Sequence, residues 1–278
     1  MSSQLEFYES PHVQKKVYAL FRDYFDRAER NRRWNLVNDI PWSECNPGLN
    51  PAIADVVQTF CMVELYLPDY VGKQLPMVRA NRGRAWMVCN WGYEEAKHSM
   101  VLGDWLLKSG ARTDEQMTDM ENSVFSQEYN LPFGSARGMI CYTSFQELAT
   151  QIHYRNLKRV AAGKCPALDR ILHLVAVDEA AHGDFFRQIV KLHLDEDREN
   201  TLEAIRQVVA TFSMPAVELF SESLRRAQTV RDLQIFNEEI YFYEVLEPTL
   251  HKLGLTRKDV RRKVKKEWDT VPTDIPKT

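Results

Sequence analysis

Two copies of a Glu-x-x-His pattern are the residues of this chain with the clearest chemical potential. They pair Glu95 with His98 and Glu179 with His182, and each pair lies in a long stretch without proline. Residues three apart share a face of a helix, so each pair can direct a carboxylate and an imidazole at one point. Both groups bind metal ions, and the pattern therefore indicates a metal site.

Two further glutamates precede these pairs at nearly equal intervals. Glu64 precedes Glu95 by 31 residues and Glu147 precedes Glu179 by 32, and both single glutamates lie in apolar stretches. The repeated order predicts two helix pairs that face each other across a pseudo-twofold axis. A helical bundle that contributes a Glu-x-x-His from two helices and one Glu from each of two others has the ligand set of a di-iron carboxylate site.

The setting of the two pairs favours a buried site. Val88, Trp91 and Leu102 share the face of the first pair, and Val175 and Phe186 share that of the second. An ionised carboxylate on an apolar face is costly unless it is paired or bound to a metal. The alternative for each pair is a buried Glu–His hydrogen bond. A third match, at Glu9 to His12, contains a proline near the terminus and receives no function.

The charge balance also favours metal ions. Four carboxylates packed together repel one another and take up protons, whereas two divalent cations cancel their charge in formal count. An oxygen-rich set with two imidazoles suits iron or manganese, because structural zinc prefers four closed ligands.

Helical patterns dominate the chain, and few segments have the pattern of a strand. Helices are expected over residues 11–34, 52–72, 77–108, 113–127, 137–163, 166–195, 199–229, 231–253 and 256–268. Pro215 should kink or split the helix that contains it. No linker divides the sequence, so residues 1–278 are expected to form a single domain, an all-α elongated helical bundle.

The composition excludes several classes of protein. The chain has 278 residues, of which 44% are hydrophobic and 27% charged, as in ordinary globular proteins. No apolar run approaches the roughly 20 residues that cross a bilayer, and the N-terminus lacks the pattern of a signal or transit peptide, which predicts a cytoplasmic protein. The five cysteines form no Cys-x-x-Cys, and the net charge of −3 gives no indication of nucleic-acid binding.

From about residue 34 to about residue 253 the sequence resembles the soluble acyl-carrier-protein desaturases, which are ferritin-like di-iron enzymes. The most specific stretch is Tyr142-Thr-Ser-Phe-Gln-Glu-Leu-Ala-Thr150, similar to the family's Tyr-Thr-Ser-Phe-Gln-Glu-x-Ala-Thr. Similar motifs are Glu64-x-x-Leu-Pro68, Glu94-Glu95-x-x-His98, Asp178-Glu179-x-x-His182 and Ser213-Met-Pro-Ala216. Residues 133–141 differ from the plant members where the substrate cavity is lined, so chain length and double-bond position are not transferred.

The resemblance implies six ligands to two iron ions, with manganese as an alternative metal. Glu95 and Glu179 are expected to bridge the two ions. The implied ligands are Glu64, Glu95, His98, Glu147, Glu179 and His182.

Three more residues receive roles from the resemblance. Asp178 is expected to hydrogen-bond the metal-bound ring of His98. Trp34 matches a residue that continues the line of contacts from the metal through His98 and Asp178 to the surface, and that carries electrons inward. The alternative is a packed aromatic residue at a helix end. Thr150 matches a residue that helps to manage protons; the alternative is a helical threonine bonded to its own backbone.

The activity implied by the resemblance is oxygen-dependent introduction of a cis double bond into an acyl chain held as a thioester on acyl carrier protein. A ferredoxin-like protein would supply the electrons, and the enzyme would be a homodimer of fatty acid metabolism and biosynthesis. Because acyl carrier proteins are acidic, a basic docking patch is expected. The candidates are Arg79, Arg82 and Arg84, the group Arg30 to Arg33, and the group Arg257 to Lys266.

Other functions keep the same ligand spacing. The site could hydroxylate or N-oxygenate a substrate of specialised metabolism, and the carrier could be coenzyme A. A non-enzymatic ferritin-like metal-binding bundle is a third class. A radical-generating subunit would need a tyrosine close to the metal, for which Tyr66, Tyr93 and Tyr142 are available.

Overall fold

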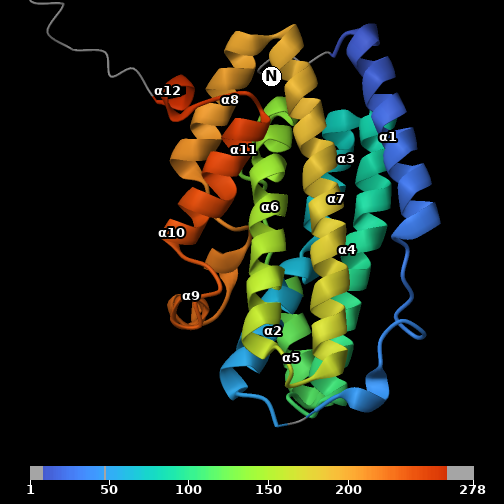
Figure 1. Cartoon of the computed structure of the whole chain (residues 1–278), viewed down its shortest axis with the longest axis vertical. Helices are drawn as coiled ribbons and strands as arrows, with labels where there is room; N and C mark the ends of the chain where they lie inside the picture. Colours follow the sequence, from blue (N-terminus) through green and yellow to red (C-terminus); the bar gives the residue numbers. More distant parts are fainter. Residues whose placement is uncertain (1–8, 47, 262–278) are drawn as a thin grey trace, which may run out of the picture.

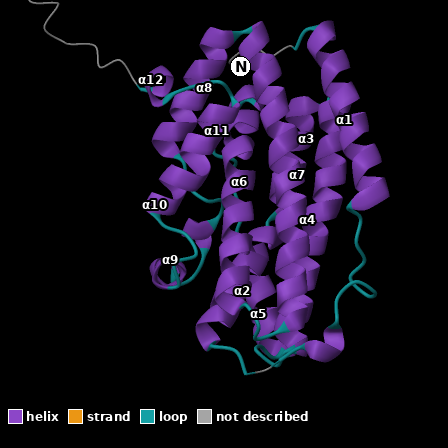
Figure 2. Ribbon diagram, viewed as in Figure 1, coloured by secondary structure: helices purple, strands orange, loops and turns teal. Residues whose placement is uncertain are grey.

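The computed structural model describes residues 9–46 and 48–261, and this part of the chain is helical with no strand (Figure 2). The long helices run along the long axis of an elongated bundle (Figure 1), which confirms the predicted fold class. The α-helices are α1 (Pro11–Asn31), α2 (Pro51–Leu65), α3 (Leu67–Val78), α4 (Arg82–Lys108), α5 (Asp114–Phe125), α6 (Ala136–Ala161), α7 (Pro166–Glu196), α8 (Arg198–Thr211), α9 (Ser223–Asp232), α10 (Glu238–Ile240), α11 (Glu247–Lys252) and α12 (Arg257–Val260).

Helices α2, α4, α6 and α7 form the centre of the bundle. Helix α6 packs along α7, α2 packs along α4, and α4 also contacts α7. Helix α1 covers α4 and α7, while α8 and the π-helix η3 (Tyr241–Leu246) pack against α6. In Figure 1 the C-terminal helices therefore lie on the side of α6 that faces away from α1. None of the described helices combines the length and apolarity needed to cross a membrane.

Side chains that accept backbone N–H groups fix the start of three central helices. Asn50 accepts from Ala52 N at 3.0 Å before α2, and Asn81 accepts from Arg84 N at 3.1 Å before α4. Ser135 accepts from the amide of residue 138 at 3.1 Å before α6. Such caps satisfy amides that have no partner within the helix and are worth about 1 kcal/mol each.

The expected helix over 52–72 is wrong in one respect, because the chain breaks at Tyr66. Helix α2 ends at Leu65, and α3 begins at Leu67 with Pro68 in its first turn. Proline has no N–H to donate to the carbonyl four residues earlier, which is that of Glu64. Helix α3 then continues to Val78, so α4 begins later than the expected residue 77.

The expected split at Pro215 is confirmed. Helix α8 ends at Thr211, and the chain passes through the short 3-10 helix η2 (Val217–Leu219) before α9. Ala216 and Glu222 flank η2 and adopt left-handed backbone angles, φ 60° and 58°. These angles are uncommon for residues other than glycine, and they occur directly before η2 and directly before α9.

The expected helix over 231–253 is wrong in its first part. The chain turns at Gln234, where φ is 53°, and continues as α10, η3 and α11 without a gap. The extra residue per turn of a π-helix is often associated with functional sites. Of the expected helix over 256–268, only α12 falls within the described residues.

Gly83 allows α1 and α4 to touch through their backbones. A Cβ at this position would lie 2.7 Å from Tyr18 N and 2.8 Å from Val17 C, both backbone atoms of α1. No side chain can rotate away to relieve such a contact. The position of α1 on the bundle therefore requires glycine.

We expect Gly83→Ala to lower the free energy of unfolding by about 1–3 kcal/mol, because the added methyl group forces α1 away from α4. Urea unfolding followed by circular dichroism measures the change. Gly72→Ala is the matched control, since a Cβ there meets no atom within 4 Å and alanine favours the helix. Equal stability of the Gly83 variant and the wild type would contradict the close approach.

Candidate metal centre

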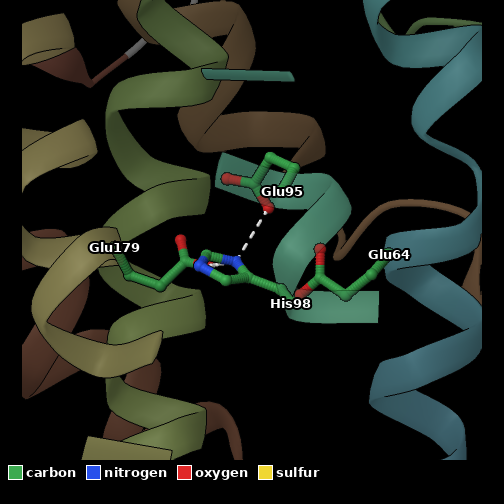
Figure 3. Close-up of side chains that lie close together, drawn as sticks. All are labelled: Glu64, Glu95, His98 and Glu179. Carbon is green, nitrogen blue, oxygen red and sulfur yellow. Dashed lines mark hydrogen bonds and ion pairs between the residues drawn. The ribbon is translucent and has the colours of Figure 1, made fainter. Parts of the chain in front are cut away.

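Six buried side chains converge between α2, α4, α6 and α7. The structure places them in two groups of four, and within each group the potential ligand atoms lie within 4.8 Å of one another. Figure 3 shows the first group, in which the carboxylates and the imidazole point toward one another from three helices. The first group is Glu64, Glu95, His98 and Glu179, and the second is Glu95, Glu147, Glu179 and His182.

Glu95 and Glu179 belong to both groups, which is the position that a bridging carboxylate needs. They occupy equivalent places in the two Glu-x-x-His motifs, on α4 and α7. Close packing of α6 on α7 supports this arrangement: a Cβ at Gly183 would lie 3.3 Å from the Cβ of Glu147. The six residues named from sequence are therefore brought together at one place in the bundle.

Both imidazoles present the same nitrogen to the carboxylates. Nδ1 of His98 lies 3.2 Å from both Glu95 Oε2 and Glu179 Oε1. Nδ1 of His182 lies 3.1 Å from Glu95 Oε1 and 3.3 Å from Glu147 Oε2. The two rings are thus related by the pseudo-twofold arrangement that the repeated motifs predict.

The other ring nitrogen of each histidine faces a carboxylate from the opposite motif. Nε2 of His98 lies 3.3 Å from Asp178, and Nε2 of His182 lies 2.7 Å from Glu94. A carboxylate that accepts the Nε2 proton leaves Nδ1 with a free lone pair and fixes the orientation of the ring. Asp178 therefore lies where the resemblance implied, and Glu94 is its counterpart.

One arginine joins these two outer carboxylates. Arg32, just after α1, donates to Asp178 through Nη1 and to Glu94 through Nη2, the latter at 3.0 Å. Tyr24 and Arg33 also donate to Glu94. Burial raises the pKa of Glu94, but the hydrogen bond from His182 and the charge of Arg32 outweigh it and lower the pKa.

The pKa values of three inner carboxylates are shifted, and not all in the same direction. Burial, followed by the charges of Glu95 and Glu179, raises the pKa of Glu64 well above its usual value. Burial and then Glu179 do the same to Glu147. For Glu95, burial is outweighed by His98 and His182, and its pKa is lowered. Without cations, Glu64 and Glu147 therefore hold their protons more strongly than exposed carboxyl groups do.

Orphaned atoms provide the test of whether these residues fit metal ions. Among the described residues, Glu95 Oε1, both carboxylate oxygens of Glu147 and Glu179, and Nδ1 of His182 are buried without a hydrogen bond of normal geometry. Buried carboxylates are costly when unpaired. A set of orphaned oxygens and imidazole nitrogens that face one another fits two cations with oxygen and nitrogen ligands.

Trp34 extends the line of contacts outward. Its Nε1 donates to Asp178 Oδ2 at 2.7 Å, and Asp178 contacts His98. The ring is only 6% exposed, and the ammonium of Lys97 lies 3.9 Å from its centre. The line therefore ends beneath the surface, which differs from the expectation of a residue that reaches it.

Thr150 is 8% exposed, and its hydroxyl donates to the carbonyl of Gln146 at 3.0 Å. This is the helical backbone bond that the alternative interpretation described. Thr150 also lines the two cavities beside the centre, together with Glu64 and Val63.

The larger of these cavities, here the α9 cavity, has a volume of about 390 Å³ and reaches from Glu64 to α9. Its walls are mostly apolar, and they include Phe60, Val230 and Phe236. The smaller one, the α3 cavity, has a volume of about 30 Å³ and includes Tyr70 of α3. Glu64 lines both cavities, so both adjoin the candidate metal centre.

Sequence reasoning assigned no role to two residues that contact the centre, although Glu94 stands in one of the motifs it quoted. Glu94 precedes Glu95 as Asp178 precedes Glu179, and this parallel could have identified it. Tyr154 donates to Glu64 Oε1 from the next helix pair, and its place two turns after Glu147 was the available signal.

Several other expectations are corrected. Of the three tyrosines named, Tyr93 is 57% exposed on the outside of α4, so it does not face the metal site. Arg84 is buried in an ion pair with Glu9 at 3.1 Å, and Arg32 is bound to the outer carboxylates, so neither is free to dock an acidic carrier. The part of the basic group Arg257 to Lys266 that follows residue 261 lies outside the described residues.

Comparisons with known proteins agree with this geometry. A family model described as fatty acid desaturase matches residues 61–273. A protein assigned as acyl-[acyl-carrier-protein] desaturase DesA1, from Mycobacterium tuberculosis, is 24% identical over 248 residues, which cover 80% of this chain and 71% of that protein. Stearoyl-[acyl-carrier-protein] 9-desaturase 1 of Oryza sativa subsp. indica is 32% identical over 135 residues, 45% of this chain and 34% of that protein.

Solved structures share the fold. The X-ray structure of a protein assigned as acyl-ACP desaturase DesA2, from Mycobacterium tuberculosis, aligns with a TM-score of 0.67 and 18% identity over 88% of this chain and 95% of that chain. An R2-like ligand-binding oxidase with a Mn/Fe cofactor aligns with a TM-score of 0.57 and 14% identity over 90% of this chain and 96% of that chain. The ferritin-like architecture is confirmed, and the match over residues 61–273 shows that the chain belongs to the fatty acid desaturase family.

Proposed function

We propose that this protein is a di-iron desaturase that introduces a cis double bond into an acyl chain held as a thioester on acyl carrier protein. The observation that carries the proposal is the set of six buried ligands beside an apolar cavity. Membership of the fatty acid desaturase family supports the reaction class. The names of DesA1 and of the rice protein, both acyl-[acyl-carrier-protein] desaturases, support the carrier.

The six ligands would hold two iron ions, with Glu95 and Glu179 shared between them. A reduced pair of iron ions supplies the activation of dioxygen that removal of hydrogen from an unreactive methylene group requires. The overall reaction consumes dioxygen, two electrons, two protons and two substrate hydrogens, and it yields an alkene and two water molecules. The protein must therefore position the chain, deliver electrons and supply protons.

The cavities are suited to position the chain. An acyl chain that lies in the α9 cavity and continues into the α3 cavity passes Glu64 and Thr150 at the junction. Apolar walls exclude water from the reacting carbon atoms, and a fixed path holds one bond next to the centre. The hydroxyl of Thr150 is then proposed to relay protons at this junction.

Electrons would enter along Trp34, Asp178 and His98, which are joined by contacts of 2.7 and 3.3 Å. We propose a ferredoxin-like donor because each turnover needs two electrons from outside the chain. Of the basic candidates for carrier docking, Arg30, Arg79 and Arg82 are exposed and keep that role in the proposal. A homodimer in the cytoplasm remains part of the proposal.

We expect Glu179→Gln to lower the iron bound after anaerobic loading from about two ions per chain to less than about one, because a shared ligand of both ions is lost. Elemental analysis of the desalted protein measures the change. Glu196→Gln is the matched control, since it removes an exposed carboxylate from the same helix. A Glu179 variant that binds as much iron as the control would contradict the proposed ligand set.

Metal uptake should release protons and weaken as the pH falls. The raised pKa values of Glu64 and Glu147 mean that both carboxyl groups of the metal-free folded protein keep their protons to a higher pH than exposed glutamates do. The charge of Glu95 likewise raises the pKa of His98 against the effect of burial. Cations must displace these protons, so affinity is expected to rise with pH.

Titration with Mn²⁺ in weakly buffered solution, with a pH electrode, tests this expectation at about pH 6 and about pH 8. Tighter binding at the higher pH, with proton release on each addition, is the expected result. Binding that is independent of pH and releases no proton would show that the carboxyl groups are already ionised.

Activity is tested with iron-loaded protein, a ferredoxin reducing system, dioxygen and a series of acyl carrier protein thioesters. Mass spectrometry is expected to show loss of two hydrogen atoms from the acyl chain, and no such loss with Glu179→Gln. A product that gains an oxygen atom would indicate hydroxylation in place of desaturation. Absence of both products from fully loaded protein, on every chain length, would exclude the proposed reaction.

A further inference from the structure

A buried arginine lines the wall of the α9 cavity. Arg226 lies in the first turns of α9 and is 8% exposed. Its Nη1 donates to Thr59 Oγ1 at 2.9 Å, and its Nε donates to the carbonyl of Ser221 at 3.2 Å. Two acceptors satisfy only part of the five N–H donors of a guanidinium group.

Arg226 has no carboxylate partner among the described residues. The carboxylates that influence it electrostatically are Asp55 and Glu222, and both are ion-paired with Arg225, at 3.1 and 2.8 Å. Arg112 is also ion-paired with Asp55. The cluster therefore contains more guanidinium groups than carboxylates, and the surplus positive charge faces the cavity.

Such a charge is costly to bury without a counter-ion. The beginning of α9 adds to the cost, because the positive end of the helix dipole disfavours a cation and the first turn contains no acidic residue. The cavity walls are mostly apolar, and the other charged residues that line them are Glu64 and the pair Arg231–Glu238, which is joined at 2.5 Å. The guanidinium of Arg226 is therefore suited to pair with an anion that enters with the ligand.

A second polar group in the same cavity also lacks a partner. The hydroxyl of Tyr241, in the π-helix η3, is buried and forms no hydrogen bond with the described residues. Burial raises the pKa of Tyr241, so the phenol remains a neutral donor. A ligand with oxygen acceptors would satisfy both Tyr241 and Arg226, whereas a plain hydrocarbon would satisfy neither.

We propose that the α9 cavity binds an anionic acyl ligand, whose negatively charged oxygen group pairs with Arg226 while its apolar chain lies toward Glu64 and Thr150. This inference rests on the proposed function, and it adds the recognition of charge to it. Thr59, the neighbour of Arg226, precedes Glu64 by five residues of α2, or about 7.5 Å of helix. The residue that Arg226 contacts and the ligand Glu64 thus belong to the same helix.

Two sources could supply the anionic group. One is the carboxylate of a free fatty acid, and the other is the phosphodiester in the prosthetic arm of a carrier. Both present oxygens that a guanidinium binds in the same way. The experiment below has one arm for each source.

The first arm compares a fatty acid with its methyl ester, and the second compares acyl-phosphopantetheine with acyl-pantetheine of the same chain. Isothermal titration calorimetry measures the affinity of the metal-loaded protein for all four ligands. We expect wild-type protein to bind the charged member of at least one pair about tenfold or more tightly than the neutral member. We expect Arg226→Gln to lose this preference and Arg226→Lys to keep part of it.

Arg22→Gln is the matched control, because it removes an exposed, ion-paired guanidinium from α1, which does not line the cavity. This variant should keep the wild-type preference. The pair that shows the preference identifies the source of the anion. Equal affinity within both pairs for wild-type protein, or a preference that survives in Arg226→Gln, would overturn the proposal.

Two features distinguish a failure of this proposal from misfolding of the variant and from a failure of the desaturase proposal. The wild-type comparison needs no variant, so it remains decisive if Arg226→Gln does not fold. The readout is affinity rather than turnover. A protein that forms the alkene but does not distinguish charged from neutral ligands would therefore refute the role of Arg226 and leave the desaturase proposal intact.

Discussion

The structure depends on the burial of four carboxylates and two imidazoles at the centre of a helical bundle. Ion-pair contacts among these six groups do not satisfy them, since most of the inner carboxylate oxygens lack a normal hydrogen bond among the described residues. Such a cluster destabilises a metal-free protein, because each buried group must take up a proton or remain unpaired. Cations remove this conflict, and the surrounding helices can then pack as closely as Gly183 allows.

The sequence was sufficient to predict the centre of the fold. Helices α4, α6 and α7 have long periodic patterns with caps or an initial proline, and their observed limits agree with the prediction within a few residues, except at the start of α4. The ligand set could also be named, because spacing within a helix fixes which side chains share a face. Glu94 could have been named by the same logic, from the parallel with Asp178.

What the sequence could not predict depends on contacts between distant segments. The turn at Gln234 lies within a pattern that is helical by composition, and tertiary packing decides where such a helix begins. The break at Tyr66, by contrast, could have been predicted from Pro68. The burial of Arg84 could not be predicted from the sequence either, because its ion-pair partner Glu9 is 75 residues away along the chain. The α9 cavity exists only because residues 212–241 fold back over α2 and α6, so Arg226 gave no signal in the sequence.

Arg32 has a consequence that reaches beyond local geometry. Its terminal nitrogen Nη1 donates to Asp178, and its other terminal nitrogen Nη2 donates to Glu94. Each of these carboxylates orients a different histidine. The electronic environments of both imidazoles are thereby linked through one cation outside the four central helices. A substitution of Arg32 would therefore change the basicity of both histidines together. The two halves of the centre cannot be adjusted separately through this residue.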